Sequence, residues 1–340
     1  MRLYSFITNK ISVDGRFLRT YIPFLYHLYL KVMYINKEDK DLSGIRKSFG
    51  EKHPDKTFFV IGMDNYGLGL LSYFNCVLGY IKFARRKGYI PIVDMKNYPN
   101  TYLEKDEVGI INSWEYYFDQ PCNYTLDEVY ESKNVMMSSG ICTIEAGPPI
   151  LWFYYCRWWS RKRAQEYDRI IGNQLKVNRK TKAVLDDNYS RILSGKRAIG
   201  VVKRGTDIIN CSGHAIQPQL SELIDRTKKM LTVWNCDYVF LATEETSTVK
   251  TFREVFGDRL LINQSARVDH YSGGAIGDVS FNRANDKYLK GLEYLTTVYL
   301  LSQCTCLIGS LVGSTTGALL LNKDRYEHTY IYDLGVYHEQ

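Results

Sequence analysis

Short apolar runs recur along the chain, and a segment with helical spacing follows most of them. The first run, residues 58–62, is rich in aromatic and β-branched side chains, and residues 70–87 continue with a helical pattern that ends at Gly88. Residues 90–94 form the next run. Runs of this length are typical of strands that are buried on both faces, and a strand–helix–strand order favours a parallel sheet.

The second half of the chain repeats this alternation around a polar, glycine-rich loop at residues 264–287. We expect strands at 198–202, 237–242, 259–262 and 306–309, and helices at 219–234, 247–256, 289–303 and 314–321. Strands that alternate with helices in both halves predict an α/β fold with two Rossmann-like domains facing a cleft, an architecture of the GT-B type.

Three segments divide the chain in this interpretation. Residues 1–55 form an N-terminal helical leader, residues 56–194 the first Rossmann-like domain and residues 195–340 the second. The leader contains an aromatic stretch, residues 17–34, in which charged residues and a proline recur. These interruptions argue against a membrane span and leave two interpretations, a helix packed on the protein body and a helix that lies at a membrane surface.

The composition is that of a globular protein with a basic excess. Of 340 residues, 45% are hydrophobic and 28 are tyrosines, which suit carbohydrate and nucleobase surfaces but also follow from composition bias. The net charge of +7 favours anionic partners such as nucleotide diphosphates or acidic lipids. Over this length it does not establish nucleic-acid binding, although the charge and the aromatic residues leave an RNA-binding protein as a further alternative. The eight cysteines include no C-x-x-C pair, so we expect them to be reduced and the protein to be cytoplasmic.

The turn after the strand at 198–202 carries the most informative set of side chains. Ligands of open α/β sheets bind at the carboxyl ends of the strands. There a guanidinium fork can hold two phosphate oxygens, a glycine lets backbone N–H groups approach, and a carboxylate can hold the arginine in one rotamer. An ordinary strand-end turn with a surface ion pair is the alternative. The set consists of Lys203, Arg204, Gly205, Thr206 and Asp207.

A second strand end presents a hydroxyl and two carboxylates, on Thr243, Glu244 and Glu245. Such groups can contact a ribose or the edge of a guanine, or hold a basic residue. They are equally typical of the start of a helix, where a hydroxyl caps and acidic side chains are favourable.

Two further turns lead from a strand into a helix. The late one offers backbone N–H groups and hydroxyls at a helix N-terminus, an arrangement that binds anions, with simple capping as the alternative. The early one has two glycines that allow close approach to a ligand, and tight helix–strand packing explains it equally well. The residues are Gly313, Ser314, Thr315 and Thr316 in the late turn, and Gly67 and Gly69 in the early one.

Taken in order, these motifs resemble the fucosyltransferase superfamily that includes the alpha-1,6-fucosyltransferases and the rhizobial nodulation-factor fucosyltransferases. Members carry G-V-H-V-R-R-T-D at a strand end, then F-L-A-T-D-D, then a late stretch F-L-S-Q-x-D-F-L-V-C-T-x-S-S-Q. This chain has G-V-V-K-R-G-T-D at 200–207, F-L-A-T-E-E at 240–245 and L-L-S-Q-C-T-C-L-I-G-S at 300–310. The resemblance covers roughly residues 58–95 and 195–322.

The resemblance implies a glycosyltransferase that is inverting and metal-independent and needs no cofactor. Its co-substrate would be a GDP-sugar, above all GDP-fucose, and its acceptor an oligosaccharide, polysaccharide or glycolipid, as in polysaccharide biosynthesis. Residues 56–194 would form the acceptor side and 195–340 the nucleotide-sugar side. No nucleic acid is implied as a partner, and contact with an anionic membrane stays open.

Individual positions take their roles from the same resemblance. Arg204 matches the arginine that binds the β-phosphate of the donor, and Asp207 matches its acidic partner. Glu244 and Glu245 match the paired acidic residues after Ala-Thr. The turn at 313–316 falls where the family contacts the diphosphate, and the turn at 67–69 looks like the glycine turn of the first family domain.

Several positions depart from the family pattern. Val202 replaces a histidine, Ile208 and Ser212 stand where the alpha-1,6 enzymes place a lysine and the catalytic glutamate, and Thr297 lies near the site of an aspartate that reads guanine. These departures motivate an alternative, a non-catalytic membrane-peripheral or polysaccharide-binding protein with a degenerate transferase fold. If the chain is an enzyme, the candidates for its general base are Glu145, Glu244, Glu245 and His214.

Overall fold

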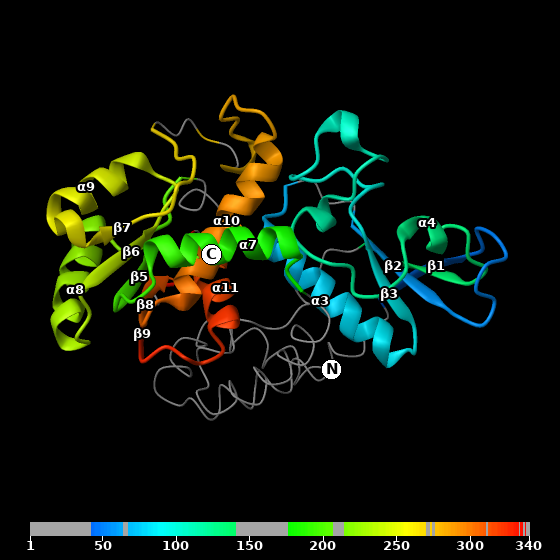
Figure 1. The fold of residues 1–340 in the computed structure, drawn as a ribbon, viewed down its shortest axis with the longest axis horizontal. Helices are drawn as coiled ribbons and strands as arrows, with labels where there is room; N and C mark the ends of the chain where they lie inside the picture. The colour runs from blue at the N-terminus through cyan, green and yellow to red at the C-terminus, as the bar shows by residue number, and fades with distance from the viewer. Residues whose placement is uncertain are drawn as a thin grey trace, which may run out of the picture.

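The structure is a computed structural model. It describes residues 42–63, 67–140, 176–206, 214–269, 273, 276–310, 312–332, 334–335 and 337. The aromatic stretch at 17–34 lies outside the described residues, and so do Glu145 and Asp207. Figure 1 shows two β-sheets with helices between and around them.

The first sheet contains β1 (Ser43–Lys47), β2 (Phe58–Gly62), β3 (Ile90–Asp94) and β4 (Val135–Ser138). The strands lie in the order β1-β4-β2-β3. β2 runs parallel to both of its neighbours, whereas β1 pairs with β4 in the antiparallel direction at the edge. Every residue of β2 is buried, which explains why this strand reads as a continuous apolar run.

Helix α3 (Leu70–Arg86) connects β2 to β3 and buries most of its residues against this sheet. It begins directly after Gly69, and Gly88 follows its last turn with a left-handed φ of 73°, the usual way to end a helix. Shorter elements lie between β3 and β4. They are η1 (Lys105–Glu107), η2 (Ser113–Tyr116) and α4 (Leu126–Val129).

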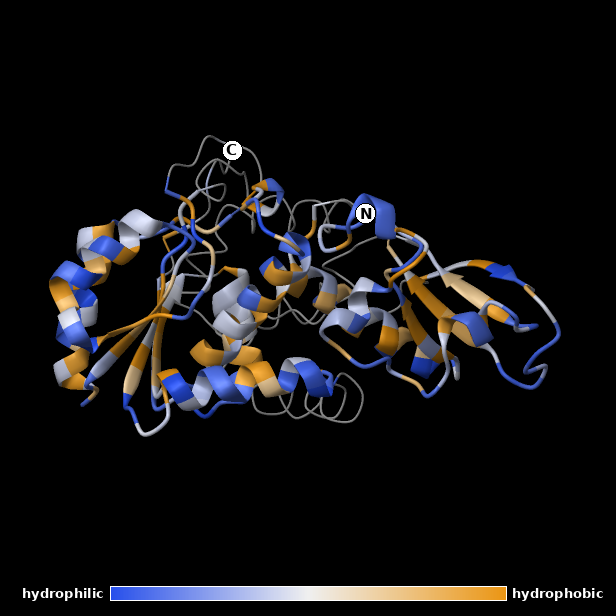
Figure 2. Ribbon diagram, turned by 45° about the horizontal axis from the view of Figure 1, so that its top comes forward, coloured by the Kyte–Doolittle hydropathy of each residue, from blue (hydrophilic) through white to orange (hydrophobic). Residues whose placement is uncertain are grey.

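The second sheet is entirely parallel, in the order β7-β6-β5-β8-β9. In chain order its strands are β5 (Ala198–Val202), β6 (Tyr238–Ala242), β7 (Leu260–Leu261), β8 (Cys306–Ser310) and β9 (His328–Tyr332). Figure 2 shows how hydrophobic these strands are compared with the helices beside them.

Helices cover both faces of the second sheet, as expected of a Rossmann-like fold. One face packs against α8 (Leu220–Val233) and α9 (Thr246–Phe256), which η4 (Gly257–Arg259) follows. The other face packs against α7 (Arg179–Ile192), α10 (Asp286–Gln303) and α11 (Gly313–Asn322). A further short helix, η5 (Ile276–Asp278), precedes α10.

Helix α10 packs into the cores of both sheets. Its residues Leu292, Leu295 and Val298 belong to the cluster that contains β2 and α3, whereas Leu300 and Leu301 belong to the core under the second sheet. The approach is close, because a Cβ atom at Gly291 would lie 2.1 Å from the Tyr117 hydroxyl. Figure 1 shows α10 between the two sheets.

The central strands agree with the sequence pattern. Strands at 58–62, 90–94 and 198–202 are confirmed with the same bounds. Other expectations are corrected: β7 covers only Leu260–Leu261, and α10 begins at Asp286, inside the expected loop. The pattern did not predict β1, β4 or β9, and β1 lies in the range assigned to the leader.

Among the described residues, no helix combines the length and the apolar character that crossing a bilayer requires.

Candidate functional site

The turn after β5 is held by a carboxylate from the end of β6. Glu244 Oε1 accepts hydrogen bonds from Gly205 N at 3.0 Å and from Thr206 Oγ1 at 2.9 Å. Arg204 Nε lies 3.3 Å from the same oxygen. β5 and β6 are paired in parallel register, so their carboxyl ends coincide. The sheet therefore brings together two motifs that are distant in the sequence, and Glu244 anchors the arginine turn.

The backbone of this turn is tight at two positions. A Cβ atom at Gly205 would lie 2.3 Å from Glu245 Oε1, so any larger residue would require that carboxylate to move. Thr206 has a φ of 44°, in the left-handed region that β-branched residues rarely adopt. Such a conformation costs about 1–3 kcal/mol and persists where neighbouring contacts hold it, as the bond to Glu244 does here.

Opposite charges meet in a partly buried environment. The side chains of Arg204 and Glu244 are 19% and 13% exposed, so their ion pair is screened less than one on the surface. Burial lowers the pKa of Lys203, while the nearby Glu245 and Glu244 act against this shift. The Lys203 ammonium donates to the carbonyl of Arg204 at 3.1 Å. Glu245 accepts from Thr248 Oγ1 at 2.9 Å, close to the start of α9.

A helix N-terminus lies at the end of β8, the strand on the other side of β5. Gly313, Ser314 and Thr315 form the first turn of α11, whose amides have no acceptor within the helix. In the described part of the chain, the buried hydroxyls of Ser310 and Thr315 have no hydrogen-bond partner. The Thr316 hydroxyl donates to Gly313 O at 3.0 Å. N–H groups at such a position favour an anion.

Tyr294, on α10, connects the two halves of this site. A Cβ atom at Gly313 would lie 3.1 Å from the Tyr294 hydroxyl, so this hydroxyl lies against the first residue of α11. Burial raises the pKa of Tyr294 to about 12, with Arg204 acting to lower it and Glu244 to raise it. The phenol therefore lies against the start of α11, and the charges of the turn after β5 influence its pKa. No sequence signal pointed to this residue, because it occupies an ordinary position in an apolar helix.

The glycine turn of the first sheet also approaches α11. Gly67 has a left-handed φ of 108°, and Gly69 directly precedes α3. Two residues later, Leu71 lies so close to Gly317 that a Cβ atom there would be 2.2 Å from its Cδ1. The start of α3 thus packs one turn along from the start of α11.

The remaining predicted residues are distributed differently. Thr243 Oγ1 accepts from Glu245 N at 3.3 Å and so belongs to the cluster at the end of β6. His214 is exposed, and its carbonyl accepts from Tyr337 N. Within the described residues, no hydrogen bond or ion pair links His214 to the turn at Arg204. Asp207 and Glu145 lie outside them, so their expected roles stay predictions.

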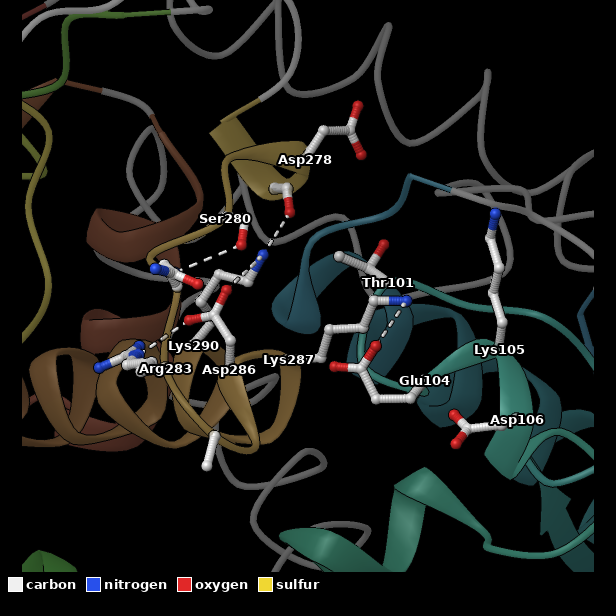
Figure 3. Close-up of a pocket in the computed structure, with 13 residues that line it drawn as sticks. Thr101, Glu104, Lys105, Asp106, Asp278, Ser280, Arg283, Asp286, Lys287 and Lys290 are labelled. Atoms are coloured by element: carbon white, nitrogen blue, oxygen red, sulfur yellow. Dashed lines mark hydrogen bonds and ion pairs between the residues drawn. The ribbon is translucent and has the colours of Figure 1, made fainter.

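A polar cleft of about 690 Å³ lies between the segment around η1 and the start of α10 (Figure 3). Some of its charged groups are paired. Lys287 Nζ lies 3.6 Å from Glu104 Oε2, and Asp286 Oδ1 accepts a hydrogen bond from Arg283 Nε at 2.8 Å. Thr101 Oγ1 donates to Leu68 O at 3.2 Å, which places the glycine turn beside the cleft. The volume is that of an ordinary small-molecule site. The lining residues are Thr101, Glu104, Lys105, Asp106, Gly277, Asp278, Ser280, Asn282, Arg283, Ala284, Asp286, Lys287 and Lys290.

No protein-family model matches the chain. No curated protein matches it either.

Several solved structures are similar in fold at low sequence identity. NodZ alpha-1,6-fucosyltransferase soaked with GDP-fucose has a TM-score of 0.47 and 16% identity, over 78% of this chain and 93% of that one. POFUT1 in complex with GDP has 0.46 and 9%, over 81% and 99%. A mutant of Arabidopsis thaliana FUT1 in complex with GDP has 0.43 and 10%, over 96% and 79%. With identities and TM-scores this low, any function has to be inferred from the residues of the site itself.

Proposed function

We propose that the chain is a glycosyltransferase that takes its sugar from a nucleoside-diphosphate donor, with GDP-fucose as the first candidate. One observation carries the proposal. Arg204, held by Glu244, follows β5, and the first turn of α11 follows β8, which pairs with β5 in parallel, so both lie at the same edge of the sheet. A cation and a set of helix-end amides therefore converge at the carboxyl end of a parallel sheet. A diphosphate needs both, because it carries charge and has several acceptor oxygens.

The chemistry follows from the charge of the leaving group. When the bond between the sugar and the diphosphate breaks, negative charge accumulates on the phosphate oxygens. Arg204 and the amides of the first turn of α11 are arranged in advance to stabilise it, and such prearranged donors lower the barrier most. One oxygen of Glu244 accepts two hydrogen bonds and also forms the ion pair with Arg204. These interactions suit Glu244 to position Arg204 rather than to move a proton.

In the proposed inverting reaction, an acceptor hydroxyl attacks the anomeric carbon from the side opposite the diphosphate, assisted by a carboxylate or imidazole as general base. The acceptor is a glycan. In this GT-B-like arrangement the second sheet holds the donor and the first sheet presents the acceptor. No metal ion is assigned a role.

Val202 and Ser212 stand where the fucosyltransferase pattern has a histidine and a glutamate. These two departures support a second candidate, a non-catalytic binding protein. A chain of this kind could bind the donor or a polysaccharide without turnover. Such a protein would retain the affinity for a nucleoside diphosphate but release none of it from a nucleotide sugar.

The decisive experiment compares Arg204→Ala with a matched control, Arg191→Ala, whose arginine forms an exposed ion pair with Asp187 on α7. Binding of GDP is measured by the rise in melting temperature, and turnover by the release of GDP from GDP-fucose with and without glycan acceptors. We expect Arg204→Ala to lose about a hundredfold or more in turnover, the typical effect of removing one transition-state donor. We expect the control to match the wild type.

The outcomes separate the candidates. Wild-type turnover in Arg204→Ala would remove this arginine from the mechanism. Binding of GDP without any release from GDP-fucose would favour the non-catalytic protein. A wild-type chain that binds no nucleoside diphosphate would refute the proposed function.

A further inference from the structure

The ring of Tyr294 packs against other side chains, so the hydroxyl is the part of this residue that can interact with a ligand. The ring packs against the core cluster that joins the first sheet to α10. The adjacent residue, Leu295, and the residues about one turn away on either side, Gly291 and Val298, are all buried. A ring fixed in this way places its hydroxyl with little freedom, so a ligand that binds it loses little conformational entropy in ordering it.

The hydroxyl lies beside the helix N-terminus at which an anion would bind. It lies against Gly313, the first residue of α11, where a Cβ atom would be 3.1 Å away. The amides of this first turn have no acceptor within the helix. The buried hydroxyls of Ser310 and Thr315, without partners among the described residues, lie at the same strand-to-helix turn.

The phenol is a donor whose proton is not used elsewhere in the described structure. Among the described residues, none exchanges a hydrogen bond with the Tyr294 hydroxyl, whereas Tyr117 and Tyr299 use theirs on Tyr288 O and Asp186. Because burial raises the pKa of Tyr294 to about 12, its hydroxyl remains protonated at neutral pH. The neighbouring carboxylate, Glu244, is already occupied by Arg204, Gly205 and Thr206.

From this geometry we infer that the Tyr294 hydroxyl donates a hydrogen bond to the terminal phosphate of the nucleotide, beside Arg204 and the first-turn amides of α11. This inference rests on the proposed function and deepens it, because it adds a third kind of donor to the diphosphate site. The role is specific to the leaving group: the hydroxyl stabilises a phosphate oxygen both in the bound diphosphate and while charge develops on it.

The test removes one oxygen atom and leaves the ring in place. Tyr294→Phe is compared with Tyr299→Phe, a matched control further along α10, whose hydroxyl bonds Asp186 at 3.2 Å. Affinities for GDP and for guanosine are measured by calorimetry, together with kcat and KM for GDP-fucose. We expect Tyr294→Phe to bind GDP about tenfold more weakly, to bind guanosine as the wild type does, and to have a lower kcat. The control should change none of these values.

Each other outcome is informative. Wild-type GDP affinity and kcat in Tyr294→Phe would overturn the inference and leave the proposed function intact. Equal losses of GDP and guanosine binding would show that Tyr294 only packs the site, which also overturns the inference. If the wild-type chain binds GDP no better than guanosine, the diphosphate site does not exist, and both the inference and the proposed function fail.

Discussion

Adding a single methyl group at Gly291 should test how closely α10 approaches the first sheet. In Gly291→Ala the new Cβ would lie 2.1 Å from Tyr117 Oη, 2.5 Å from Tyr117 Cζ and 2.9 Å from Tyr102 Cδ1. Optimal contacts between carbon atoms are about 3.5–4.0 Å, so the rings must move by about 1 Å. They have little room, because Tyr117 is fully buried and its ring is stacked on that of Tyr288, with 5.9 Å between the ring centroids.

The magnitude follows from three contributions. Overpacking of a tight core costs about 1–3 kcal/mol. Moving Tyr117 breaks its 2.9 Å hydrogen bond to Tyr288 O and leaves a buried donor, at a cost of about 1–3 kcal/mol. Alanine gains about 1 kcal/mol over glycine inside a helix. We therefore expect Gly291→Ala to lower the free energy of unfolding by about 3 kcal/mol.

Chemical denaturation followed by circular dichroism measures this loss, and a double-mutant cycle locates it. Tyr117→Phe removes the atom at 2.1 Å, so it should cost less when Gly291→Ala is already present than in the wild type, with a coupling of about 1 kcal/mol. A Gly291→Ala protein that is more stable than the wild type by about 1 kcal/mol would refute the reasoning. That result is what helix propensity alone predicts.

Two further substitutions probe charged groups. Glu244→Gln keeps a side-chain oxygen near Gly205 but removes the charge that holds Arg204, so the affinity for GDP should fall by about 10–100-fold. The control Glu254→Gln, on the exposed side of α9, should leave this affinity unchanged. Calorimetry measures both affinities, and equal values for the two variants would contradict the anchoring role of Glu244. Burial would raise the pKa of Asp286, but hydrogen bonds from Arg283 and Phe281 and the charge of Lys290 lower it below its ordinary value. A lowered carboxyl pKa stabilises the fold above the ordinary value, and this contribution disappears as the pH falls through the lowered one. At neutral pH, Asp286→Asn should therefore lower the free energy of unfolding by about 1–3 kcal/mol, as measured by chemical denaturation. The difference in unfolding free energy from the wild type should shrink in acid, and a difference that stays constant down to low pH would contradict this account.

The strands that the sequence predicts are those that are fully buried, because such strands consist of consecutive apolar residues. β2 and β5 are buried at every position and read as unbroken apolar runs. The edge strands β1 and β9 have mostly exposed or half-buried residues, so their sequences carry no comparable signal. Their pairing comes from neighbouring strands, which a pattern along the chain does not reveal.

The sequence predicted part of the candidate site. Arg204 and the turn at 313–316 stood out because polar groups and glycines follow apolar strands at the edge where ligands bind. The sequence suggested Asp207 as the partner of Arg204, whereas the parallel register explains why Glu244, from the next strand, lies beside it. Tyr294 could not be found in this way, since only the packing of α10 against α11 brings its hydroxyl to Gly313.

The position of α10 limits how this protein can be divided. A cut near residue 194 looks natural along the chain, since it separates the two sets of strands. Helix α10 would then stay with the second fragment and expose Leu292, Leu295 and Val298, which now lie among first-sheet residues. The first fragment would in turn lose the cover over Tyr117. Neither piece would retain a complete interior, so efforts to express one half alone need to supply this helix, or a substitute for it, to both.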